Sequence, residues 1–66
     1  MSNTESWPNL VGKPVYQAVV TIKSQNSNFD VIPLPEGSPV TFDFRPNRVH
    51  VFFDANRKVS SVPSIG

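Results

Sequence analysis

The 66-residue chain contains no cysteine. Disulfides and metal sites built from thiolates are therefore excluded. The chain also has no large excess of charge. Six Lys and Arg residues are balanced by five Asp and Glu residues, which gives a net charge of +1. Such a balance produces no field that would attract nucleic acid or an anionic membrane. The chain must depend on apolar packing, on its seven prolines and on paired polar groups for its stability.

Long apolar runs are missing as well. No stretch approaches the roughly 20 residues of a membrane span, and the N-terminus does not show the pattern of a signal peptide. We therefore expect no membrane partner, and either an intracellular protein or a processed secreted form, because the absence of cysteine fits both. The single histidine, without cysteine, paired carboxylates or a metal cluster, also argues against an enzyme, a cofactor or a metal site.

The length allows one domain, which at this size buries only about 60% of the surface of the unfolded chain. The polar residues 1–6 are expected to form a disordered N-terminal tail. Residues 7–66 are expected to form a single domain, and Trp7 has the bulk to cover its core. We also expect this domain to be a monomer.

One segment has helical periodicity. Val15, Ala18, Val19 and Ile22 are spaced at i, i+3, i+4 and i+7, which is one face of a helix. Pro14 before them fits the first turn of a helix. The many β-branched residues lower helix propensity, however, and the same stretch also alternates as a strand would. The periodicity favours a helix and leaves a strand open.

Two later segments read as strands, Val31 to Leu34 and Val49 to Phe53. Pro33 lacks an N–H group, so its position must face away from a partner strand. Three residues near the C-terminus are predicted to close the core: Val59, Val62 and Ile65. Together these elements predict a small α+β domain, with one α-helix packed on a small sheet.

The stretch from Gly37 to Val51 is the most informative for function. A turn-prone segment leads to Phe42, which lies between Thr41 and Asp43 and is followed by cations. Those cations are Arg45, Arg48 and His50. The pattern suggests an exposed loop with an apolar tip. By sequence alone, Phe42 is equally an ordinary buried strand residue, and isolated arginines are usually plain surface charges.

Four motifs in order give this chain a resemblance to a known family. They are Trp7-Pro8 with Val11-Gly12-Lys13, Leu34 to Thr41 (LPEGSPVT), Arg45 with Asn47-Arg48-Val49, and Val62-Pro63 with Ile65-Gly66. Each is weak alone, but their combined order and spacing are specific. The chain resembles the potato inhibitor I family of serine protease inhibitors from Trp7 to Gly66, without gaps.

The resemblance implies an α-helix over Val15 to Gln25 and a mixed sheet in which the two predicted strands pair in parallel. The long exposed loop between them would be the reactive loop, with its cleavable bond between Phe42 and Asp43. The protease-binding residues implied are Ser38, Pro39, Val40, Thr41, Phe42, Asp43, Phe44 and Arg45. Loop support is implied for Arg48, for His50 and for the C-terminal carboxylate of Gly66, with the cations donating to Thr41 and Asp43.

Three residues depart from the relatives on which this resemblance rests. His50 stands in place of an arginine, and we expect its support to strengthen as the imidazole protonates below about pH 6.5. Pro46 is expected to stiffen the end of the loop. Pro14 replaces a Ser or Thr helix cap, which typically contributes about 0.5–2 kcal/mol. The role of Arg45 stays open between protease contact, loop support and neither.

The resemblance predicts a reversible, substrate-like inhibitor of chymotrypsin-like and subtilisin-like serine proteases, because the primary pockets of both accept a large apolar group such as Phe42. One alternative is a non-inhibitory storage or interaction scaffold of the same fold. Another is a single-stranded nucleic-acid binder, since phenylalanines alternate with cations around the loop. The balanced charge argues against that binder.

Overall fold

The structure, a computed structural model, describes residues 6–40 and 43–66. A short 3₁₀ turn, Pro8–Leu10, precedes helix α1, Val15–Gln25. Three strands follow, β1 (Asp30–Pro35), β2 (Arg48–Phe53) and β3 (Ser64–Ile65), in the order β1-β2-β3. Strand β1 is parallel to β2, and β3 is antiparallel to it. The predicted α+β fold, with one helix on a small mixed sheet, is confirmed.

Helix α1 uses the face that the periodicity predicted. Ala18 and Ile22 are fully buried, and Val15 packs against the core, whereas Tyr16 is exposed. Pro14 occupies the N-cap position and provides no side-chain hydrogen bond there. Instead, the N–H group of Val15 donates to the main-chain oxygen of Arg57 at 2.9 Å. The first four N–H groups of a helix have no acceptor within the helix. Here the turn that contains Arg57 supplies an acceptor for one of them.

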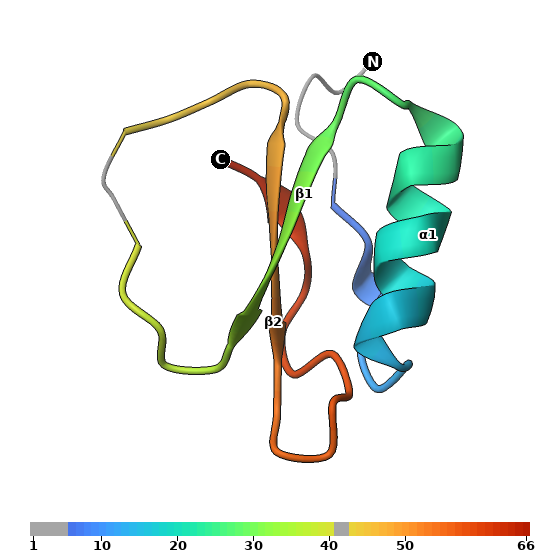
Figure 1. The fold of residues 1–66 in the computed structure, drawn as a ribbon, viewed down its shortest axis with the longest axis vertical. Coiled ribbons are helices and arrows are strands. Elements are labelled where there is room, and N and C mark those ends of the chain that lie inside the picture. The colour runs from blue at the N-terminus through green and yellow to red at the C-terminus, as the bar shows by residue number, and fades with distance from the viewer. Residues whose placement is uncertain (1–5, 41–42) are drawn as a thin grey trace.

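The parallel pair forms the centre of the molecule. Val31 pairs with Val49 and Pro33 with Val51. The N–H groups of Asp30 and Glu36 donate towards β2, so the alternate position of Pro33 faces away from that strand, as predicted. Helix α1 contacts both β1 and β2, and the β1–β2 loop extends on the other side of the sheet (Figure 1). The core consists of Trp7, Leu10, Ala18, Ile22, Phe29, Val49, Val51 and Val59.

The C-terminal segment corrects one prediction about the core. Val59 is buried and Ile65 packs against the core, as expected, but Val62 is 47% exposed. Pro63 is fully buried in its place, and its main-chain oxygen accepts from the N–H group of Trp7 at 3.0 Å. Ser6, assigned to the tail, forms an isolated antiparallel bridge with Ser64. Within residues 6–40 and 43–66, no helix is long and apolar enough to cross a membrane.

Candidate functional site

The loop between β1 and β2 is fixed where it leaves β1. The N–H group of Glu36 donates to the main-chain oxygen of Phe53 at 2.7 Å. The chain therefore remains hydrogen-bonded to β2 for one residue beyond the end of β1. A turn follows, in which the N–H group of Ser38 donates to the oxygen of Pro35 at 3.1 Å. Its third residue, Gly37, has a φ of +82°, a conformation that favours glycine.

The other end of the loop is fixed by a second turn. The N–H group of Arg48 donates to the oxygen of Arg45 at 3.2 Å. Pro46 occupies the second position of this turn, where its fixed φ is favourable. The oxygen of Asn47 also accepts from the N–H group of Asp30 at 2.7 Å. Both ends of the loop are therefore tied to the sheet by main-chain hydrogen bonds.

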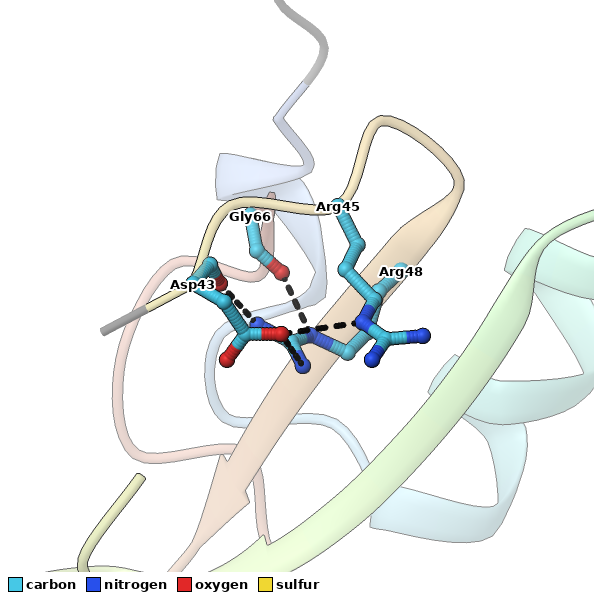
Figure 2. Close-up of polar contacts among 4 residues, drawn as sticks. All are labelled: Asp43, Arg45, Arg48 and Gly66. Atoms are coloured by element: carbon cyan, nitrogen blue, oxygen red, sulfur yellow. Dashed lines mark hydrogen bonds and ion pairs between the residues drawn. The ribbon is translucent and has the colours of Figure 1, made fainter. Parts of the chain in front are cut away.

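Arg48 connects the loop to the C-terminal segment. It is the first residue of β2 and only 8% exposed. Its Nη2 donates to the main-chain oxygen of Asp43 at 2.6 Å, its Nε donates to the main-chain oxygen of Gly66 at 2.7 Å, and its Nη1 lies 3.6 Å from Asp43 Oδ2 (Figure 2). The N–H group of Gly66 donates back to the Arg48 oxygen at 2.9 Å. One buried guanidinium thus joins loop, β2 and the end of β3.

Arg45 also reaches Asp43. Its Nε donates to Asp43 Oδ2 at 3.0 Å, so the two arginines approach the same carboxylate (Figure 2). Unlike Arg48, the Arg45 side chain is mostly exposed. The sequence left the role of Arg45 open. The opposite charges at positions 43 and 45 were the available signal, but whether they meet depends on the path of the loop.

The supporting role predicted for His50 stays a prediction, because Thr41, one of the residues it was expected to support, lies outside the described residues. The His50 ring is partly buried, lies 6.1 Å from the Phe52 ring centre and makes no side-chain hydrogen bond to residues 6–40 or 43–66. Burial first and Arg48 second lower the pKa of His50 from 6.5, while Asp43 acts in the opposite direction. Protonation of His50 is therefore moved below pH 6.5, and a donor that strengthens on protonation stays a prediction.

The lowered pKa of His50 has a consequence for stability. The unfolded chain binds a proton near pH 6.5 and the folded chain only at lower pH, so stability decreases as the pH falls through this window. We expect the urea midpoint of the wild type to decrease between pH 7.5 and 5.5 by more than that of His50→Gln, which cannot titrate. Equal decreases in the two proteins would contradict the assignment.

Most of the remaining described residues of the predicted loop are exposed to solvent. Ser38 is partly buried, whereas Pro39, Val40 and Phe44 are exposed, Phe44 to 71%. Thr41 and Phe42, which the resemblance places on the amino side of the cleavable bond, lie outside the described residues. In the part of the chain that the structure describes, no group of three or more His, Cys, Asp or Glu residues could hold a metal ion.

Comparison with known proteins shows the family of the chain. The model of the potato inhibitor I family matches residues 1–66. Protease inhibitor HPI of Hevea brasiliensis is 48% identical over 61 residues, covering 92% of this chain and 87% of that protein. Eglin C of Hirudo medicinalis is 46% identical over 66 residues, covering 98% and 94%. The crystal structure of bitter gourd trypsin inhibitor superposes with a TM-score of 0.88 at 36% identity, covering 92% and 90%.

These matches define the class of protein first: the chain is a serine protease inhibitor and not an enzyme. It belongs to the potato inhibitor I family, as the sequence motifs indicated. Other relatives are named for inhibition of chymotrypsin, of subtilisin or of trypsin, so the family does not by itself assign a preferred target.

Proposed function

We propose that the protein is a reversible, substrate-like inhibitor of serine endopeptidases that prefer a large apolar residue, with Phe42–Asp43 as its reactive bond. The segment from Ser38 to Arg45 enters the protease cleft in extended form. The Phe42 side chain fills the primary specificity pocket, and its carbonyl group faces the nucleophilic serine and the oxyanion hole.

The support beneath Asp43 is the observation that favours this proposal most. Arg48 holds the main-chain oxygen of the residue that follows the proposed bond, and it is itself fixed by Gly66. Hydrogen bonds from a charged donor are stronger than neutral ones, and a guanidinium can make several at once. A loop held in its binding shape avoids an ordering cost of about 0.5–1.5 kcal/mol per immobilised side chain. Such a loop binds tightly for its size.

The same support explains why the inhibitor resists turnover. Cleavage of the proposed bond would free the amino group of Asp43, and Arg48 would keep that residue attached to the scaffold through its main-chain oxygen. The new amine therefore stays near the acyl carbon, and religation competes with release. Proximity of this kind accelerates intramolecular reactions strongly.

The identity of Phe42 sets the expected target class. Burying a Phe side chain contributes about 1.5–3 kcal/mol, and chymotrypsin offers a hydrophobic primary pocket, whereas trypsin requires Lys or Arg. Titration of chymotrypsin, subtilisin, elastase and trypsin tests the assignment. We expect strong inhibition of chymotrypsin and subtilisin, and weak inhibition of trypsin. A preference for trypsin would overturn the proposed target class.

A further inference from the structure

A hollow lies at the start of the β1–β2 loop. Its volume is about 410 Å³, within the range of about 300–1,000 Å³ that is usual for small-molecule sites. Three segments line it: the start of the loop, strand β2 and the chain that follows the turn after β2. The lining residues are Glu36, Gly37, Ser38, Phe52, Ser60 and Ser61.

Phe52 forms the apolar part of the hollow. Alternate residues of a strand face opposite sides of a sheet, so Phe52 points away from the buried Val51 and towards the side on which the loop extends (Figure 1). Its ring is partly buried, and the centre of the His50 ring lies 6.1 Å from its centre. An aromatic side chain of this kind offers a ligand a large apolar surface.

Main-chain hydrogen bonds hold the two walls of the hollow. The N–H group of Glu36 donates to the oxygen of Phe53 at 2.7 Å, which fixes the wall formed by the start of the loop. The N–H group of Ser60 donates to the oxygen of Phe52 at 2.9 Å, which fixes the opposite wall. Both walls are therefore joined to β2 without a ligand, and a preformed site avoids part of the cost of ordering on binding.

The polar groups of the hollow are available to a ligand. To residues 6–40 and 43–66, no side-chain hydrogen bond or ion pair is made by Glu36, Ser38, Ser60 or Ser61. Glu36 is the one charged residue among the described lining residues. A carboxylate accepts hydrogen bonds, and a hydroxyl group both donates and accepts. The hollow thus presents acceptors and one negative charge beside an aromatic ring.

We propose that this hollow binds a small organic ammonium ion, that is, an amine carried on an apolar or aromatic group. An ammonium group has three N–H donors and no acceptor, which matches the carboxylate and hydroxyl oxygens. Hydrogen bonds between charged partners are stronger than neutral ones, and a cation is also attracted to the face of a phenylalanine ring. The charge of Glu36 disfavours an anion, and a neutral sugar would gain nothing from it. The site goes beyond the proposed function and involves no protease.

Titration of the free protein with phenethylamine, followed in amide NMR spectra, tests the proposal. This amine is a cation at neutral pH. We expect a saturable change with a Kd near the millimolar range. Phenylethanol, which carries a hydroxyl group in place of the ammonium group, should bind about threefold more weakly at low salt, and phenylpropionate more weakly still. The largest shifts should occur at the amides of Gly37, Ser38, Ser60 and Ser61.

Two substitutions separate charge from the aromatic surface. Glu36→Gln removes the charge and keeps the size of the side chain, so it should weaken phenethylamine binding about threefold and leave phenylethanol binding unchanged. Phe52→Leu should weaken the binding of both compounds. Asp30→Asn, which removes an exposed carboxylate from the other end of β1, is the matched control and should leave both Kd values unchanged.

The outcomes that contradict this site are distinct from those that contradict inhibition. Equal Kd values for the wild type and Glu36→Gln, shifts centred away from the hollow, or the absence of saturable binding would overturn the proposal. Tighter binding of methyl glucoside than of phenethylamine would overturn the proposed ligand class. None of these results depends on a protease, so the proposed function is decided separately by its own titration.

Discussion

Replacing Phe42 with lysine should convert the protein from an inhibitor of chymotrypsin into an inhibitor of trypsin. The lysine cannot fill a hydrophobic primary pocket, but it supplies the cation that the trypsin pocket binds. Loss of about 1.5–3 kcal/mol of apolar burial corresponds to a loss of about ten- to a hundredfold in affinity for chymotrypsin. Affinity for trypsin should rise by at least as much. Inhibition constants for both proteases, measured on the same preparations, check the prediction.

The chain provides a matched control for this exchange. Phe44 lies two residues further along, is the same residue type and is 71% exposed. Phe44→Lys introduces the same cation on the leaving-group side of the proposed bond and should not create trypsin inhibition. If Phe42→Lys leaves the protease preference unchanged, or if Phe44→Lys shifts it equally, Phe42 is not the primary specificity residue.

Replacing Arg48 with alanine should turn the inhibitor into a substrate. The change removes the hydrogen bonds to the main-chain oxygens of Asp43 and Gly66, which are the direct connections between the loop and the end of β3. Hydrogen bonds to a charged group contribute about 1.5–3 kcal/mol each. We expect hydrolysis of the Phe42–Asp43 bond to accelerate by at least about tenfold, which corresponds to about 1.4 kcal/mol. Stability to urea should decrease in parallel.

Arg48→Lys separates loop support from charge. Lysine keeps the positive charge but lacks the planar fork that reaches two acceptors at once. It should therefore be cleaved at a rate between those of the wild type and Arg48→Ala. Circular dichroism of each variant checks that the cleavage rates compared are those of folded proteins. A folded Arg48→Ala protein that is cleaved at the wild-type rate would show that Arg48 does not restrain the loop.

The helix was predicted although two sequence patterns disagreed, and the resemblance also implied it. Helical spacing of Ala18 and Ile22 outweighed the low helix propensity of the valines around them, because burial of that face contributes more than propensity costs. The outward orientation of the Pro33 position followed from its missing N–H group. The prediction for Val62 was wrong because an irregular segment has no period, and Pro63 points into the core instead.

The supporting residues were only partly predictable. Arg48 and Gly66 followed from the resemblance, and the structure brings them within hydrogen-bond distance. The position of His50 in the strand was equally clear; its ring lies 6.1 Å from that of Phe52 and makes no side-chain hydrogen bond to the described residues. The contact of Arg45 with Asp43 depends on how the loop turns at Pro46, which residue type and spacing do not determine.

Mapping the bond that a protease cuts tests the central claim most directly. The wild-type protein is incubated with chymotrypsin, and the products are identified by mass spectrometry. If the protein is a reversible, substrate-like inhibitor with this reactive bond, it should be converted slowly to a mixture of intact protein and protein cut only between Phe42 and Asp43. The purified cut form should regenerate intact protein when fresh protease is added. Cleavage at another bond, or degradation without any religation, would contradict the account.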